Sequence, residues 1–166
     1  MATVGDVMEK LKILNKGQTQ MNMKIKVKKI LENATLPKRA TDGSAGLDLC
    51  VCLSHDSLEI KVGDTFTTRT GIAVEIPHGY VGMIVPRSSV GKTGLRLANT
   101  VGVIDSDYRG EILLVWQNTE DYPIIIKNGQ RVAQILIVPV CMADVVQVDE
   151  LSKTERGSGS FGSTGE

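Results

Sequence analysis

From Lys24 to about residue 150, the chain is a series of short segments with the character of β-strands. These segments alternate apolar and polar residues or are rich in Val, Ile and Thr. Turn-forming pairs such as Asp42-Gly43, Gly63-Asp64 and Asn128-Gly129 fall between them at short intervals. No segment has the pattern of the crossover helices that join parallel strands, and only residues 90–98 suit a short helical turn. The pattern therefore predicts an all-β fold, either a sandwich or a jelly roll.

The positions of the strands follow from the same pattern. Asn128-Gly129 lies between two apolar runs, which is a typical signal for a β-hairpin. A second hairpin is expected where "GVID" leads through "SDYRG" into "EILLVW". Strand-like segments are expected at residues 25–30, 46–53, 65–76, 80–86, 111–118, 122–140 and 144–151.

Some of these segments are apolar on both faces. In residues 111–118, Ile112, Leu114 and Trp116 alternate with Leu113 and Val115. A two-layer sandwich buries one face of each strand and leaves the other in water. A second apolar face therefore predicts subunit packing, most simply in a closed symmetric oligomer.

Charge and composition exclude several classes of function. The 19 Lys and Arg residues balance 19 Asp and Glu residues, whereas binding to nucleic acid or acidic membranes needs clustered basic surface. The three cysteines lack Cys-x-x-Cys spacing, which favours free thiols in a reducing compartment. No run approaches the roughly 18 apolar residues of a membrane helix, and charges interrupt residues 1–16 too often for a secretory signal. We expect a soluble, cytoplasmic protein without a nucleic-acid or membrane partner.

The N-terminal stretch differs from the rest of the chain. Residues 1–16 carry apolar residues at helical spacing, which is typical of an amphipathic helix that docks on the body or on a partner. A dispensable extension fits the same residues. We therefore divide the chain into an extension of unknown role at 1–22, a β domain at 23–150 and a C-terminal segment at 151–166. A protein partner that binds through residues 1–20 stays open.

Two segments place polar groups where a core does not need them. In "SAGLDL", Asp48 lies between two leucines, so its carboxylate needs partners or the edge of a site. It either accepts backbone N–H groups in a turn or holds a metal-bound water. In "PRSSVGKTG", residues 86–94, Arg87, Ser88 and Ser89 supply a cation, hydroxyls and amides that suit phosphate. The spacing of its glycine and lysine residues is not that of a P-loop. By composition, a plain loop without a ligand fits these residues equally well.

Two more segments have the same property. In "NTVGVIDSDYRGEI", residues 99–112, Asp105 directly follows an apolar Val-Ile pair. It is either a general base held in a dry wall or a turn cap. In "GQRVAQIL", residues 129–136, Gln134 shares a strand face with Val132 and Leu136. Its amide needs hydrogen-bond partners and is either a structural hub or a ligand contact.

The C-terminal sequence "RGSGSFGSTGE", residues 156–166, is the last unusual segment. Such Gly/Ser sequences are usually flexible linkers or frayed ends. The alternative is a tail that becomes ordered over a ligand. In that case Arg156 pairs with an anion, Phe161 stacks on a flat ring, and Gly162, Ser163 and Thr164 donate to phosphate oxygens.

Together and in this order, the motifs resemble those of the homotrimeric dUTPases, most closely the bacterial-type branch. The resemblance covers about residues 24–166 and rests on "SAGLDL", "PRSS", "GVIDSDYRG", "GQRVAQ" and "RGSGSFGSTG". It implies a jelly-roll, β-clip homotrimer with active sites between subunits. It also implies hydrolysis of dUTP to dUMP and pyrophosphate with Mg²⁺, which keeps uracil out of DNA and supplies dUMP for dTMP synthesis. A bacterial, phage or viral origin fits equally.

The resemblance also implies a role for each matching residue. Asp105 would activate the water that attacks the α-phosphorus, and Asp48 would reach Mg²⁺ through water. Arg156 would meet the γ-phosphate, and Phe161 would stack on uracil as part of a closing lid. The residues implied to bind phosphates are Arg87, Ser88, Ser89, Gln134, Arg156, Ser163 and Thr164. Those implied to bind uracil or deoxyribose are Asn99, Gly102, Val103, Ile104, Tyr108, Phe161 and Gly162.

Two other functions compete with this one. The first is a dCTP deaminase, or a bifunctional deaminase–dUTPase, on the same fold. Tyr108 in "DSDYRG" and the complete glycine-rich tail favour the plain dUTPase. The second is a dUTPase-like trimer that only binds a regulatory partner. The intact set of Asp105, Tyr108, Arg156 and Phe161 argues against it.

Overall fold

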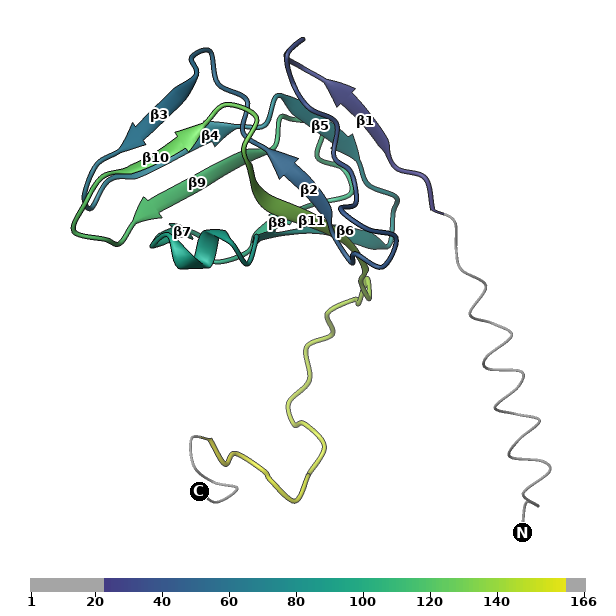
Figure 1. The fold of residues 1–166 in the computed structure, drawn as a ribbon. Coiled ribbons are helices and arrows are strands. Elements are labelled where there is room, and N and C mark those ends of the chain that lie inside the picture. The colour runs from purple at the N-terminus through teal and green to yellow at the C-terminus, as the bar shows by residue number, and fades with distance from the viewer. Residues whose placement is uncertain (1–22, 161–166) are drawn as a thin grey trace, which may run out of the picture.

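The computed structural model describes residues 23–160, and almost all of its regular structure is β-strand (Figure 1). The strands are β1 (Lys26–Lys29), β2 (Leu47–Cys50), β3 (Ser57–Ile60), β4 (Thr65–Arg69), β5 (Ile72–Glu75), β6 (Tyr80–Pro86), β7 (Leu95–Leu97), β8 (Gly102–Ile104), β9 (Leu113–Asn118), β10 (Ile124–Lys127) and β11 (Arg131–Pro139). Between β6 and β7, a single 3₁₀ turn, η1 (Val90–Lys92), occupies part of residues 90–98, where a helical turn was predicted. The prediction of an all-β fold is confirmed.

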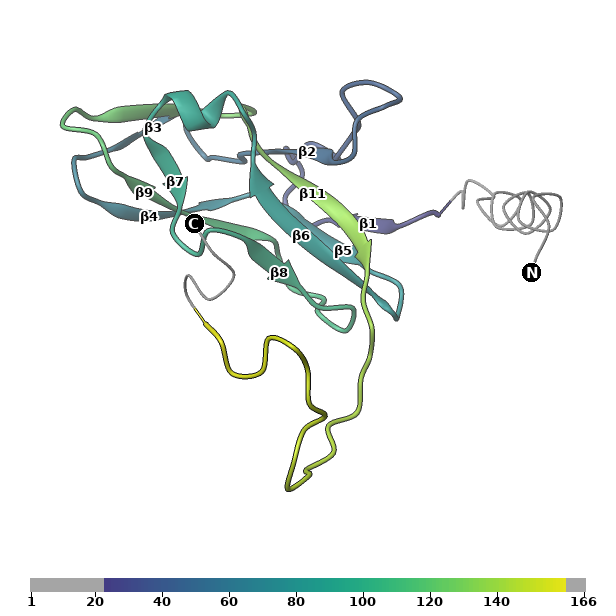
Figure 2. The same ribbon diagram turned by 90° about the horizontal axis from the view of Figure 1, so that it is seen from below.

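The strands form antiparallel sheets of two to four strands. One sheet has the order β2-β11-β6-β8 and another the order β4-β9-β7, while β1 pairs with β5 and β3 pairs with β10. Figures 1 and 2 show these sheets packed against one another around a common interior. Strand neighbours in space are mostly distant in sequence, as expected for a jelly roll rather than for a chain of hairpins.

The core is aliphatic and is centred on the one tryptophan. The side chains of Leu114 and Trp116, on one face of β9, are fully buried, as is that of Ile112 just before the strand. The Trp116 indole N–H donates to the Thr68 hydroxyl at 2.8 Å, so this polar atom has a partner inside the core. On the opposite face of β9, Leu113 is half exposed in the single chain. The alternation read from the sequence is therefore real, and residues 23–160 cover its second face only in part.

Two turns predicted to close hairpins connect strands of different sheets. The Asn128-Gly129 turn exists, with Gly129 at φ 73°, but β10 pairs with β3 whereas β11 pairs with β2 and β6. The turn is fixed from outside, because the Asn128 side-chain oxygen accepts the Leu53 N–H at 2.9 Å. The hairpin prediction was wrong here because turn chemistry specifies a reversal of the chain and not the partner of each strand.

The same correction applies to the segment "GVIDSDYRGEI". Here β8 pairs with β6, and β9 pairs with β4 and β7, so the two flanking strands do not form a hairpin. They diverge from the loop between them into separate sheets. This divergence opens a space between β8 and β9.

Two strand predictions also need correction. Residues 65–76 form two strands, because the chain turns at Gly71, where φ is 69° and an added Cβ would lie 2.7 Å from the Cβ of Ala34. Residues 144–151 form no strand. They belong to the segment 140–160, which runs away from the sheets as extended chain (Figures 1 and 2). Val145 is 99% and Leu151 85% exposed, so this segment has strand-like residues but pairs with no strand of the part of the chain that the structure describes.

Candidate active site

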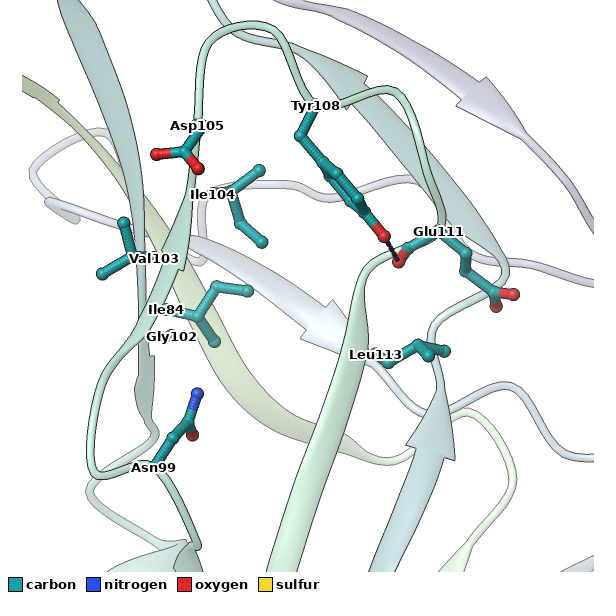
Figure 3. Close-up of a pocket in the computed structure, with 9 residues that line it drawn as sticks. All are labelled: Ile84, Asn99, Gly102, Val103, Ile104, Asp105, Tyr108, Glu111 and Leu113. Atoms are coloured by element: carbon teal, nitrogen blue, oxygen red, sulfur yellow. Dashed lines mark hydrogen bonds between the residues drawn. The ribbon is translucent and has the colours of Figure 1, made fainter.

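A pocket of about 260 Å³ occupies the space between β8 and β9 (Figure 3). Its floor is apolar and its rim carries an amide, two carboxylates and a phenol. Asn99 lies at one end and Tyr108 at the other, while Ile84 and Leu113 lie between them. The lining residues are Ile84, Asn99, Gly102, Val103, Ile104, Asp105, Tyr108, Glu111 and Leu113. Such a pocket suits a flat, partly polar ring.

The wall made by β8 offers backbone groups to a ligand. This strand lies at the edge of the sheet β2-β11-β6-β8 and, within residues 23–160, pairs only with β6, through three residue pairs. An edge strand leaves every second N–H and C=O directed away from its partner. Gly102 packs closely there, because an added Cβ would lie 3.0 Å from the Cβ of Ile84. The backbone therefore presents a row of donors and acceptors beside the pocket.

The turn before β8 is strained. Thr100 has φ 62°, in the left-handed region that a β-branched residue rarely enters. The Thr100 N–H donates to Leu97 at 2.9 Å, and the Val101 N–H donates to Asn99 at 2.6 Å. Strain of this kind persists where surrounding contacts hold it and is frequent at binding sites. Here it brings the exposed Asn99 side chain to the end of the pocket.

Asp105 and Tyr108 belong to one tight turn at the end of β8. The Tyr108 N–H donates to the Asp105 carbonyl at 3.2 Å, which closes the turn. The Tyr108 hydroxyl donates to the Glu111 carbonyl at 3.0 Å, so the ring lies along the pocket (Figure 3). Asp105 is exposed in the single chain. Residues 23–160 of this chain therefore build no dry wall around Asp105, because the chain leaves the sheet directly after Ile104.

A second polar cluster surrounds Asp48. The Asp48 carboxylate is buried, accepts a hydrogen bond from Nη1 of Arg131 at 3.0 Å, and lies 3.3 Å from Nε of Arg87. Gln134 pairs in register with Asp48, so the two side chains emerge on the same side of neighbouring strands. The Gln134 side chain also packs on Gly46, where an added Cβ would lie 2.5 Å from its Oε1. With two guanidinium groups around one carboxylate, this cluster carries net positive charge.

The comparisons with known proteins agree with this architecture. The family model of the dUTPases matches residues 32–165. The chain belongs to the dUTPase family.

Individual relatives cover most of this family member. It is 48% identical over 145 residues to the deoxyuridine 5'-triphosphate nucleotidohydrolase of Hydrogenobaculum sp., a match that covers 86% of this chain and 99% of the relative. The corresponding enzyme of Nautilia profundicola is 45% identical over 144 residues, with 86% and 99% covered. Among solved structures, a mutant dUTPase of Staphylococcus bacteriophage 80alpha with dUpNHpp superposes with a TM-score of 0.78 at 29% identity, covering 86% of this chain and 99% of that one. The dUTPase-like jelly roll is thereby confirmed.

The structure brings the predicted site residues of this dUTPase-family chain into two groups. Asn99, the β8 residues, Asp105 and Tyr108 line the pocket. Asp48, Arg87 and Gln134 form the second cluster and do not line it. Ser88 and Ser89 are exposed in the loop that follows Arg87, with Ser89 at the start of η1.

The tail residues are described only in part. The Arg156 guanidinium donates to the Gly159 carbonyl at 3.1 Å, within its own turn. The other predicted tail residues, Phe161, Gly162, Ser163 and Thr164, lie outside the described residues, as does the N-terminal stretch 1–22.

Two residues of this site escaped the sequence reasoning. Arg131 lies in the motif "GQRVAQ", and its partner Asp48 was itself recognised as a buried carboxylate, so a search for the missing cation would have found it. Glu111 lines the pocket and accepts three side-chain or backbone donors, among them Arg69. In the sequence, Glu111 is marked only as a charge directly before the apolar run 112–116.

Acidic residues do not gather into a metal cage. Within residues 23–160, no group of three or more His, Cys, Asp or Glu side chains is placed to hold a metal ion. A carboxylate has about four acceptor positions, so Asp48 can still accept a hydrogen bond from a water of an ion. The arginines beside it disfavour a free cation. The cluster therefore fits an ion that arrives on a polyanion, and not one held by the protein alone.

In the same part of the chain, no helix is long and apolar enough to cross a membrane.

Proposed function

We infer that this chain is a dUTP diphosphatase, which hydrolyses dUTP to dUMP and pyrophosphate. The observation that carries the inference is the pocket beside the free edge of β8, with Asp105 and Tyr108 on its rim, in a member of the dUTPase family. The activity follows from the family. The mechanism and the role of each residue below are our proposal.

The edge of β8 would recognise the base. Uracil presents a donor between two acceptors, and the backbone of Gly102, Val103 and Ile104 offers complementary groups on its unpaired edge. Asn99 would add an amide at the end of the pocket. Cytosine presents the reversed pattern at two positions and would leave buried groups without partners, which costs more than a poor apolar fit. The narrow space against Ile84 would exclude the thymine methyl group.

Tyr108 would recognise the sugar. Its ring lies along the pocket and its hydroxyl is engaged by the Glu111 carbonyl, so the ring face is free to pack on deoxyribose. A ribose 2′-hydroxyl would meet this ring. The exclusion of ribonucleotides would then rest on the position of one aromatic side chain.

Asp105 would act as the general base. Water attacks the α-phosphorus in line, its oxygen forms the new P–O bond, and the bond to the oxygen that bridges the α- and β-phosphates breaks. Asp105 takes the proton of the attacking water, and pyrophosphate departs. General-base assistance contributes about 10²- to 10⁴-fold, and most of the remaining acceleration would come from positioning and charge neutralisation.

The Asp48 cluster would bind the phosphates. Arg87 supplies a guanidinium held in place by Asp48, and Ser88, Ser89 and Gln134 supply donors nearby. Mg²⁺ bound to the triphosphate would neutralise charge that develops on its oxygens, as is usual for this ion with nucleotide substrates. Asp48 would accept a hydrogen bond from a water of that ion.

A homotrimer would bring the two groups of residues together. They do not share a pocket in one chain, and the exposed face of β9 and the unpaired segment 140–160 leave apolar side chains in water. Both features are explained if neighbouring subunits cover them. The tail would then close over the ligand, with Phe161 on the uracil, Arg156 on the γ-phosphate, and Gly162, Ser163 and Thr164 around the triphosphate. A further protein partner for residues 1–20 remains part of the proposal.

The deciding experiment measures pyrophosphate release from dUTP, dCTP, dTTP and UTP in the presence of Mg²⁺. We expect release from dUTP alone. An ammonia assay with dCTP tests the deaminase alternative, which predicts ammonia from dCTP. Release from none of the four nucleotides would contradict the proposal and leave a binding protein on a dUTPase fold.

A further inference from the structure

Glu111 connects the nucleotide pocket to a neighbouring corner of the fold. Its carboxylate accepts hydrogen bonds from Nε of Arg69 at 2.9 Å and from Nη2 of Arg69 at 2.6 Å, a two-point contact with the end of β4. The Gly71 N–H donates to the other carboxylate oxygen at 2.8 Å. The Glu111 side chain is only 13% exposed, whereas the Arg69 side chain is half exposed. Glu111 is therefore held by three donors of a corner that lies outside the pocket.

That corner is itself well fixed. Gly71 sits at φ 69° against Ala34, so it cannot be replaced or moved without a clash. The Thr70 hydroxyl donates to the Ile112 carbonyl at 2.7 Å, and the Ile112 N–H donates to Ile72 at 2.9 Å. Two sets of contacts thus fix the backbone at Glu111. The first is made by the Glu111 side chain, and the second by the backbone of the next residue, Ile112.

The backbone carbonyl of Glu111 holds the Tyr108 side chain. This carbonyl accepts the Tyr108 hydroxyl at 3.0 Å, as Figure 3 shows. Tyr108 is 42% exposed, so burial alone does not fix its ring. Gly110 lets the ring lie close to the chain, because an added Cβ there would be overlapped by the phenol. The orientation of the ring therefore depends on where the Glu111 carbonyl is.

We propose that Glu111 is a positioning residue for sugar selection, which sets the Tyr108 ring through the Arg69–Glu111 ion pair. The inference rests on the proposed function, because Tyr108 matters for the sugar only if the pocket binds a nucleotide. If Glu111 were only a structural clamp, its replacement would lower the stability of the fold and nothing else. A positioning residue would also change the preference for dUTP over UTP, since a ring that swings away admits the 2′-hydroxyl.

The test compares kcat/KM for dUTP and for UTP in Glu111→Gln. The glutamine has the same size but loses the charge, and its one oxygen cannot replace both carboxylate oxygens, of which one accepts from Arg69 and the other from the Gly71 N–H. We expect the dUTP:UTP ratio to fall at least about fivefold, the scale of one neutral hydrogen bond. Arg69→Lys keeps the charge but loses the two-point geometry, and we expect a smaller fall of the same ratio. Glu75→Gln, which breaks the exposed Lys26–Glu75 pair, is the matched control and should leave the ratio unchanged.

A double-mutant comparison shows whether the effect passes through Tyr108. Tyr108→Phe removes the hydroxyl that Glu111 accepts, so adding Glu111→Gln to it should lower the ratio little further. An equal fall in both backgrounds, or no fall in either, would overturn the inference. Should Glu111→Gln fail to fold, the Arg69→Lys variant with and without Tyr108→Phe gives the same comparison. An unmodified chain that does not hydrolyse dUTP would overturn the proposed function and this inference together, whereas an active chain with an unchanged ratio in the variants overturns the inference alone.

Discussion

Asp48 accepts a hydrogen bond from Nη1 of Arg131 across neighbouring strands, at 3.0 Å. The same carboxylate lies 3.3 Å from Nε of Arg87, so one buried anion orients two cations that are themselves partly exposed. This geometry assigns to Asp48 a function that the sequence did not suggest. It positions the arginine proposed to bind phosphate.

Replacing Asp48 with Asn tests this arrangement. The amide offers one oxygen in place of two and directs its NH₂ group towards a guanidinium, so both arginines lose their counter-charge. We expect the free energy of unfolding to fall by about 1–3 kcal/mol and the KM for dUTP to rise. Thermal unfolding and steady-state kinetics measure the two effects. Asp42→Asn, in an exposed turn, is the control and should stay within about 0.5 kcal/mol; a stable Asp48→Asn variant with normal KM would show that Arg87 is held by other contacts.

Most strands were predictable because each is encoded locally, but β3 and the three-residue β7 were missed. β6 runs from Tyr80 to Pro86, the same bounds that alternation and turn signals gave. Strand partners were not predictable, because a turn such as Asn128-Gly129 reverses the chain without specifying which sheet each strand joins. Residues 144–151 show the remaining limit. They have the composition of a strand, but pairing also depends on where the chain runs, and within residues 23–160 they pair with no strand.

The site was predictable where a motif lies on one loop or strand. Asn99, β8, Asp105 and Tyr108 meet in one pocket because they are close in sequence. Arg131 and Glu111 were missed because their importance depends on partners far along the chain, Asp48 and Arg69. Long-range ion pairs leave no local pattern, whereas a buried carboxylate does signal that some partner must exist.

Asp105→Asn tests the general base. The amide keeps the size of the side chain but cannot take a proton from water. We expect kcat for dUTP to fall by about 10²- to 10⁴-fold, with the affinity for a non-hydrolysable dUTP analogue preserved. Quench-flow or steady-state kinetics and calorimetric titration measure the two quantities. Asp107→Asn, two residues further along the same exposed turn, is the matched control and should retain most of the activity. Near-normal turnover in Asp105→Asn would remove Asp105 from this role.

The buried thiols predict how stability depends on pH. Burial raises the pKa of the Cys50 and Cys52 thiols above the ordinary value of 9.0. Above pH 9 these thiols are deprotonated in the unfolded chain but still protonated in the folded one, so the unfolded state binds fewer protons. These two thiols therefore leave the free energy of unfolding unchanged below pH 9. Above pH 9 they lower it progressively, as pH rises through their folded-state pKa values. Denaturant unfolding at pH 7 to 10 measures the slope.

A matched variant separates these thiols from other groups that titrate in the same range. Cys50→Ala and Cys52→Ala together should flatten the decline above pH 9, whereas Cys141→Ala should not, because Cys141 is exposed. Thiol labelling gives an independent check. At pH 8, Cys50 and Cys52 should react far more slowly in the folded protein than in the denatured one, and equal reaction in the two states would contradict the burial that the pH prediction uses.

Truncation after Glu155 tests the tail. It removes Arg156 and the glycine-rich motif but no residue of the core, so the number of subunits in the assembly should be unchanged. Two of the proposed contacts are the charge-assisted hydrogen bond of Arg156, worth about 1.5–3 kcal/mol, and the base–aromatic stack of Phe161, worth about 1–3 kcal/mol. Their joint loss corresponds to a fall of about 10²- to 10⁴-fold in kcat/KM.

Arg156→Ala and Phe161→Ala should each give part of that fall, while Lys153→Ala, just before the removed segment, should give none. A truncated chain with unchanged steady-state kinetics would mean that residues 156–166 take no part in catalysis, and the linker interpretation of this sequence would then stand.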